Sequence, residues 1–467
     1  MNDKENSMLH APVNKTLMRM AAPITLGMMS TFLFQIVDTY FVGKLGSAEL
    51  AALAFSSTAY MMTVSVFIGL SVGVSSVVAK TVGSGNREQA KSLITISLIM
   101  VLLLSVVLCF GARAAIRPMF AALGADGNVL PLIQIYMGIL FLSLPFLTVG
   151  IVGSGAVRAI GVTKVSEIAF AISGLINLVL DYLLIFGIGP FPELGLAGAA
   201  WATALSFLFL FLAMTYILLR HDLIALRIAR DAFGGLLDIL KFSVSTVSMQ
   251  VLIPATGMFT TFLLAGYGSE AVAAFGIANR IETLALVGIF AVSMSITPFI
   301  AQNFGAERHD RIDQAIIFAG KSSFYLGLVL FVGLAIFGPT IARIFSDDPQ
   351  VVRFVGLYFK VVAAAYGFQG IVNMTVAIFN GMQMPRTSLK LMAIRTFLIV
   401  FPLLYIGSLL GLMWVLIGLA LGNVLAALYA ARLMRQAERR WDCPIANDKP
   451  WTEIRNDVNR LLGKRVI

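Results

Sequence analysis

The chain has 467 residues, of which 59% are hydrophobic and 12% are charged, and its mean hydropathy is +0.90. Soluble domains carry about 25% charged residues, so this composition excludes an ordinary soluble enzyme and indicates a protein embedded in a membrane. The net charge of +10 does not indicate nucleic-acid binding, because the basic residues lie in short stretches between long apolar runs.

Twelve segments are long and apolar enough to cross a bilayer as helices, since a span needs about 20 apolar residues. In chain order they are residues 17–43, 50–79, 92–112, 127–157, 165–187, 194–219, 242–269, 283–306, 322–342, 361–385 and a 36-residue run at 396–431 that counts twice. That last run is too long for one span, and cations flank both of its ends, so we expect a hairpin of two helices there.

The distribution of basic residues predicts the orientation. With both termini on the cytoplasmic side, 27 of the 34 Lys and Arg fall in cytoplasmic segments, 5 in external loops and 2 within spans. We therefore expect a multi-pass protein of a bacterial or archaeal inner membrane. The expected organisation is a cytoplasmic segment 1–14, an N-lobe 15–220, a cytoplasmic linker 221–241, a C-lobe 242–434 and a cytoplasmic tail 435–467.

An internal repeat supports the division into two lobes. A single offset of 222 relates Gly46 to Gly268 and Tyr136 to Tyr358, and the same register holds over about a hundred residues. Each half contains six spans, an even number, so both halves enter the membrane from the same side. The sequence thus predicts an all-α membrane protein of two six-helix bundles related by a parallel repeat.

Two carboxylates inside the predicted first and fifth spans are the leading functional candidates, because a charged group in the bilayer costs roughly 2.5 to 3.5 kcal/mol. They are Asp38 and Asp181. Asn177 precedes Asp181 by four residues and so shares its helix face, and Thr203 and Tyr136 reach similar depths from neighbouring spans. The charged form of a carboxyl is disfavoured in such surroundings, so we expect this group to bind and release a coupling proton.

Three further positions carry weaker expectations. Glu282 has Arg280 two residues away near a membrane surface, and the sequence favours a structural pair of these two residues and a transport role for Glu282 equally. Pro23 weakens the first span, where we expect a conformational hinge. The repeat offset relates Asp38 to Thr260 of the second half. Because threonine has no carboxyl group, we expect ion coupling to belong to the first half alone.

No cofactor or metal is expected. The two cysteines lie far apart, the three histidines show no metal-ligand spacing, and no phosphate-binding loop for ATP occurs. The coupling ion is expected to be H⁺, but a cluster of carboxylate, amide and hydroxyl oxygens also suits Na⁺.

Several stretches together resemble the multidrug and toxic compound extrusion (MATE) family, from about residue 15 to about residue 435. They are Val-Asp-Thr-Tyr-Phe-Val-Gly at 37–43, Arg-Ala-Ile-Gly-Val-Thr-Lys at 158–164, Gly-Ala-Ala-Trp-Ala-Thr at 198–203 and Asn-Gly at 380–381. Arg-Ile-Glu at 280–282 and Thr-Pro-Phe at 297–299 resemble its DinF branch. The resemblance implies two bundles facing a central cleft and cation-driven export of amphipathic, often cationic drugs by alternating access. It also implies that Asp38, Asn177, Asp181, Thr203 and Tyr136 form the proton site of a transporter that works as a monomer.

Other functions remain open at this point. A Na⁺-coupled drug antiporter would use the same cluster with a different ion. A lipid-linked oligosaccharide flippase of the same superfamily should display a strongly cationic cleft. An intramembrane aspartyl protease, the one enzyme considered, would also need two membrane aspartates, but Asp181 is followed by Tyr182 rather than set in a Gly-x-Gly-Asp motif.

Overall fold

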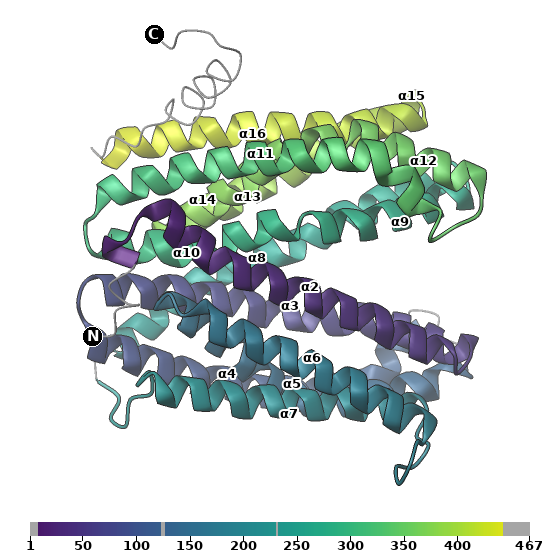
Figure 1. Cartoon of the computed structure of the whole chain (residues 1–467), viewed down its shortest axis with the longest axis horizontal. Coiled ribbons are helices and arrows are strands. Elements are labelled where there is room, and N and C mark those ends of the chain that lie inside the picture. Colours follow the sequence, from purple (N-terminus) through teal and green to yellow (C-terminus); the bar gives the residue numbers. More distant parts are fainter. Residues whose placement is uncertain (1–7, 123–126, 230–231, 442–467) are drawn as a thin grey trace. The chain divides into compact units, whose positions relative to one another are not determined.

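The computed structural model describes residues 8–122, 127–229 and 232–441, and within these ranges the regular elements are helices, with no strand (Figure 1). The amino-terminal half contains α2 (Val13–Gly43), α3 (Ser47–Gly83), α4 (Arg87–Ala122), α5 (Val129–Ala159), α6 (Thr163–Phe186) and α7 (Leu196–Arg220). The second half contains α8 (Ala232–Ala265), α9 (Ser269–Ala285), α10 (Val287–Gly305), α11 (His309–Ala342), α12 (Pro349–Val361), α13 (Tyr366–Gly381), α14 (Pro385–Ala393), α15 (Phe401–Leu410) and α16 (Leu412–Trp441).

The twelve predicted spans are confirmed, since twelve segments of the described residues are long and apolar enough to cross a membrane. The predicted hairpin is also present. Its first arm ends at Leu410, its second begins at Leu412, and Gly411 joins them with a φ of 126°, a backbone conformation that favours glycine.

The chain folds into two compact units. One, the amino-terminal unit, is Pro23–Val247, and the other, the carboxy-terminal unit, consists of Met1–Ala22 and Ser248–Ile467. These limits differ from the sequence-based ones. Helix α8 begins at Ala232, inside the expected linker 221–241, and the start of the expected N-lobe belongs to the other unit. Most of the expected tail 435–467 lies outside the described residues, and α16 occupies its first part.

Side-chain packing explains why the first helix of each half is divided between the units. The beginning of α2 buries Leu17 and Met20 in the core of the carboxy-terminal unit. The beginning of α8 packs against α3 of the amino-terminal unit, where the Thr246 hydroxyl donates to the Gly69 carbonyl at 2.8 Å. Gly69 makes this approach possible, because a Cβ there would lie 2.7 Å from the backbone of Val247.

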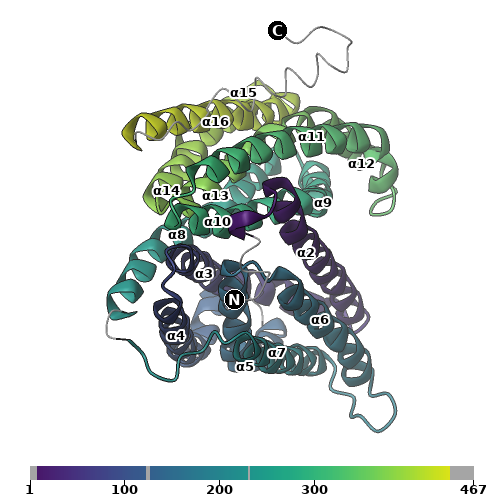
Figure 2. The same cartoon turned by 60° about the vertical axis from the view of Figure 1, so that its left-hand side comes forward.

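The internal repeat is visible in both the helix limits and the packing. Residues 47–83 form the single helix α3, and residues 269–305, displaced by 222, form α9 and α10. The Ser71 hydroxyl donates to the carbonyl of Ile151, and Ser293, at the matching position, donates to that of Asn373. Within the amino-terminal unit α5 packs against α3, α4 and α7, as α13 packs against α10, α11 and α16 in the carboxy-terminal unit (Figure 2).

The halves differ in helix regularity. The second half has a break at Leu286 between α9 and α10, a 3₁₀ turn at Ala363–Ala365 before α13, and a π-helical stretch at Ile394–Val400 between α14 and α15. The matching helices α3, α5 and α6 of the first half are continuous. Such interruptions often mark functional positions, and here they lie close in sequence to the buried polar groups of the second half.

Candidate functional site: a carboxyl pair in the amino-terminal unit

The site is built where α2 and α6 pack together. Gly174 of α6 lies so close to Phe34 of α2 that a Cβ there would be 2.1 Å from the phenyl ring. Two turns further along α2, Phe41 contacts Tyr182 and Phe186 of α6, with ring centroids 6.0 and 5.9 Å apart. These contacts hold the two helices in one register, and that register brings Asp38 and Asp181 together.

The two carboxyl groups lie within hydrogen-bonding reach of each other. Asp181 is fully buried, and among the described residues no donor reaches either of its carboxyl oxygens. Two ionised carboxylates so placed would repel each other, whereas a protonated carboxyl can donate to its neighbour. The geometry can therefore hold one proton between two acids, and the proton belongs to the pair rather than to either residue.

The other predicted site residues lie in the same unit. Tyr136 is buried on α5 and is close enough to interact electrostatically with both aspartates. The Asn177 amide donates to the Thr203 hydroxyl at 3.2 Å, and that hydroxyl donates to the Ala199 carbonyl at 3.0 Å. The structure thus forms two polar groups, Asn177 with Thr203 and Tyr136 with the two carboxyls, and among the described residues no hydrogen bond joins one group to the other. Such groups can hold a proton or a small hard cation.

Pro23 lies within α2, which continues through it without interruption from Val13 to Gly43. A proline in a helix interior removes one backbone hydrogen bond. The limit between the two units falls immediately before this residue.

The expected pairing of Arg280 with Glu282 is wrong. The Glu282 carboxylate accepts a hydrogen bond from the Tyr358 hydroxyl, and the described residues record no ion pair between it and the exposed Arg280. Residues two apart on a helix point to different faces, which is the physical reason. Tyr366, Gln369 and Arg395 lie around the same carboxylate.

Sequence reasoning missed two features. Tyr358 is the repeat counterpart of Tyr136, so in each half the same tyrosine position approaches a membrane acid, and the offset of 222 already contained that signal. The second is a buried ion pair between Arg158 and Glu167, 3.5 Å apart, in which Arg158 also donates to Ser71 at 3.4 Å. No helical spacing signals it, because a turn at residues 160–162 separates the two partners.

Comparison with known proteins places this arrangement in a family. The MatE family model matches the chain twice, over residues 23–183 and 246–406. The chain belongs to the MatE family. The two matched ranges correspond to the two halves of the internal repeat. MatE proteins are transporters, which excludes the intramembrane protease.

Individual relatives agree with this assignment. The FAD transporter of Shewanella oneidensis is 34% identical over 90% of this chain and 94% of its own length. The multidrug export protein MepA of Staphylococcus saprophyticus is 26% identical over 90% of this chain and 92% of its own length. The crystal structure of a mutant of the Vibrio cholerae MATE transporter VcmN matches with a TM-score of 0.87 at 25% identity, covering 94% of this chain and 99% of that one. The chain is thus a MatE efflux transporter with the family's twelve-helix fold.

Proposed function

We propose that this chain exports amphipathic organic cations in exchange for protons, through the carboxyl pair Asp38 and Asp181, and that it belongs to the DinF-like branch. The observation that carries the proposal is the donor-free burial of Asp181 beside a second carboxyl. A membrane acid with that environment favours binding a proton over bearing a charge. The predicted topology has both termini cytoplasmic in an inner membrane, and the transporter acts as a monomer.

The proposed coupling runs through α2. Protonation permits a hydrogen bond between Asp38 and Asp181, and loss of the proton replaces that bond by repulsion. Because the two residues lie on α2 and α6, the proton state changes the free energy of the contact between these helices. Pro23 lies where α2 leaves the amino-terminal unit. Proton release would bend α2 there and bias the transporter towards its other conformation in an alternating-access cycle.

The test is efflux of a fluorescent organic cation from proteoliposomes under an imposed pH gradient or an imposed Na⁺ gradient. We expect the pH gradient alone to drive efflux by the wild type, and Asp38→Asn to lower the rate by about a hundredfold or more, as loss of a required proton carrier would. Thr260→Val is the matched control, since Thr260 occupies the equivalent position of the second half.

The other outcomes decide between the alternatives. Efflux driven by Na⁺ and lost in Asp38→Asn would keep the site and replace the ion. An effect of Thr260→Val as large as that of Asp38→Asn would contradict coupling by the first half alone. If no gradient drives any organic cation and Asp38→Asn matches the wild type, drug export is wrong, and translocation of a fluorescent lipid-linked oligosaccharide is the next assay.

A second candidate is export of FAD or a related flavin nucleotide. It is favoured by the FAD transporter of Shewanella oneidensis, whose 34% identity to this chain exceeds the 26% of MepA. The same proteoliposomes loaded with FAD distinguish the two substrates. If the pH gradient releases FAD but does not release the organic cation, the substrate is the anionic flavin nucleotide.

A further inference from the structure

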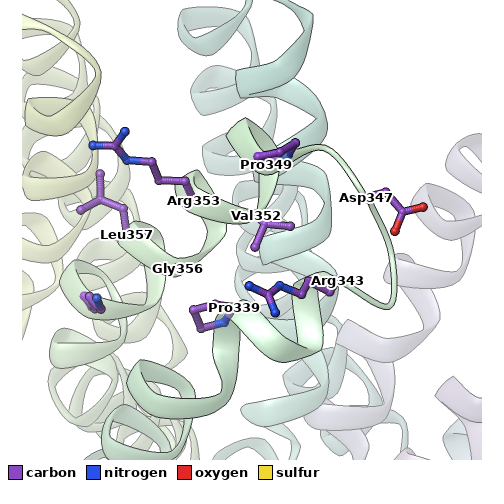
Figure 3. A pocket seen from close by; sticks show the side chains of 9 residues that line it. Pro339, Arg343, Asp347, Pro349, Val352, Arg353, Gly356 and Leu357 are labelled. Carbon is purple, nitrogen blue, oxygen red and sulfur yellow. The ribbon is translucent and has the colours of Figure 1, made fainter.

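A pocket lined by cations lies in the carboxy-terminal unit where α11 turns into α12 (Figure 3). Its volume is about 620 Å³, and its charged lining consists of Arg343, Arg353, Lys360 and a single acid, Asp347. Arg343 extends toward Pro339, whereas Asp347 lies on the far side of the loop (Figure 3). A cavity with three cations against one acid is suited to an anion.

These cations are free to bind a ligand. All three are exposed, and within the part of the chain that the structure describes none of their side chains has a hydrogen-bond or ion-pair partner. The other cations at the predicted external side include Lys44, which lies 4.7 Å from the Tyr40 ring, and Arg113, which donates to the Gly138 carbonyl. Unpartnered cations gathered at one pocket therefore distinguish this position.

Two sequence patterns show that the cluster is not incidental. With the predicted orientation, seven Lys and Arg lie outside the cytoplasmic segments, and three of the seven line this pocket. The repeat counterparts of the three are Ala121, Pro131 and Gly138, none of them charged. The cluster therefore belongs to the second half alone and is not part of the repeated scaffold.

The surroundings indicate what kind of anion binds. Ile344 and Phe345, on the same loop, are 78% and 46% exposed, so large apolar side chains adjoin the cations. Lys360 lies eleven residues into the candidate span Pro349–Gly381, about 16 Å along the helix. A lysine at that depth extends toward the headgroup region. A ligand with an anionic head and apolar chains satisfies both kinds of surface.

We propose that this pocket binds the phosphate of an anionic phospholipid, with the acyl chains against the exposed apolar side chains. Close packing of α11 on α12 shapes the site, since a Cβ on Gly356 would lie 3.0 Å from the Pro339 ring. The N-terminus of α12 adds the positive end of its helix dipole. Basic pockets between transmembrane helices recognise lipid headgroups in this way.

The experiment measures binding of phosphatidylglycerol to the purified full-length protein in a neutral detergent. Phosphatidylcholine is the zwitterionic comparison, and glycerol 3-phosphate and inorganic phosphate are the soluble sources of phosphate. The pocket variant is Arg343→Gln/Arg353→Gln/Lys360→Gln. The matched control, Lys44→Gln/Arg117→Gln/Arg280→Gln, removes the same charge from other positions outside the predicted cytoplasmic segments.

We expect the pocket variant to bind phosphatidylglycerol about tenfold or more weakly than the wild type and the control. Val352→Glu, which adds a carboxylate to the lining without removing a cation, should weaken binding similarly and serves if the triple variant does not fold. Equal binding by the pocket variant and the wild type would overturn the proposal. Equal binding of glycerol 3-phosphate and phosphatidylglycerol would contradict the proposal that the ligand is a lipid. The pocket would then be a site for soluble phosphates.

Discussion

At the scale of single residues, the buried ion pair of Arg158 and Glu167 joins three helices of the amino-terminal unit. Arg158 ends α5, Glu167 lies in the first turns of α6, and Ser71 of α3 accepts a further hydrogen bond from Arg158. Glu167 also adjoins α2, because a Cβ on Gly27 would lie 2.5 Å from its carboxylate. The repeat carries neither charge, since the matching positions are Asn380 and Leu389.

Removal of one partner of this pair should be costly. We expect Arg158→Met to lower the free energy of unfolding by about 3 to 5 kcal/mol, since Glu167 would remain buried without its cation. The double variant Arg158→Met/Glu167→Leu, which carries leucine as position 389 does, should recover most of that loss. Thermal unfolding of the purified variants checks this, and a double variant less stable than Arg158→Met would contradict it.

The role of a single residue can be predicted from the sequence only where it does not depend on partners far away in the chain. Asp38 and Asp181 were found because any acid within a span is costly, and the energetic argument needs no knowledge of neighbours. The partner of Glu282 was not found, because Tyr358 lies 76 residues away and only the fold brings the two together. The repeat register was the one long-range signal available, and it pointed to that tyrosine.

At the scale of helices, close approach depends on a few glycines. Gly198 of α7 faces the backbone of α6, and a Cβ there would lie 2.4 Å from the Leu184 carbonyl oxygen. Backbone atoms cannot move aside as a flexible side chain can. The packing of α6 on α7, which also brings Asn177 to Thr203, therefore depends on the absence of a side chain at this position.

We expect Gly198→Ala to lower the free energy of unfolding by about 1 to 3 kcal/mol, the usual cost of overpacking. Gly257→Ala is the control, since a Cβ on that helical glycine has no described neighbour within 4 Å. Alanine should leave stability unchanged there or raise it by up to about 1 kcal/mol. Thermal melting of both variants decides, and equal melting temperatures would show that α6 and α7 can separate without cost.

The segment between α7 and α8 is held against α4 by an ion pair and two hydrogen bonds. Lys91 lies 2.6 Å from Asp222, and the amide groups of Ala225 and Ala229 donate to Thr95 and Ser92. The hydrogen bond from Lys91 lowers the pKa of Asp222 below its usual 3.8. The pair therefore contributes above pH 3.8, and its contribution is lost as pH falls through the lower pKa of the folded state.

We expect Asp222→Asn to speed hydrogen exchange of residues 221–229 about two- to fivefold at pH 7, a small factor because the Asp222 carboxylate is exposed. Below the folded-state pKa the variant and the wild type should exchange alike once intrinsic rates are corrected for. Thr95→Val removes a hydrogen bond between two uncharged groups, so its effect on hydrogen exchange should be the same at every pH. A difference for Asp222→Asn that persists unchanged at pH values below the folded-state pKa would refute the role of charge.

The number and order of the spans were predictable, whereas several helix starts and the helix interruptions were not. Apolar length and flanking charge located all twelve spans and the hairpin, since both quantities are set by the bilayer. The break at Leu286 contains no proline or glycine, and neither does the π-helical stretch at Ile394–Val400. Pro402, just after that stretch, has no N–H to donate to the Leu398 carbonyl within it, a local signal that the span prediction did not use.

At the scale of the whole molecule, two helices belong to both units. Helix α2 passes from the carboxy-terminal unit to the amino-terminal unit at Pro23, and α8 passes in the opposite sense at Ser248. The sequence predicted two lobes but assigned each helix wholly to its own half, because a span is recognised by its composition and not by its neighbours. Any motion of one unit against the other must be accommodated within these two helices.

We expect Pro23→Ala to slow drug efflux several-fold, because alanine restores a backbone hydrogen bond and stiffens α2 at the limit of the two units. Pro118→Ala stiffens α4, which lies within one unit, and should leave the efflux rate unchanged. Initial rates in proteoliposomes under one fixed pH gradient provide the comparison. A folded Pro23→Ala protein that transports as fast as the wild type would show that α2 does not bend there during transport.

The anchoring of the amino-terminal segment also has a consequence for synthesis of the chain. The Met8 carbonyl accepts hydrogen bonds from Asn303 and Arg311, and Arg311 also binds the Ala11 carbonyl. Arg311 is translated 303 residues after Met8, a delay of about 15 to 60 s at ordinary ribosome speeds. Residues 8–11 are therefore without this anchor until residue 311 has been made. A product that ends before α11 lacks the anchor altogether.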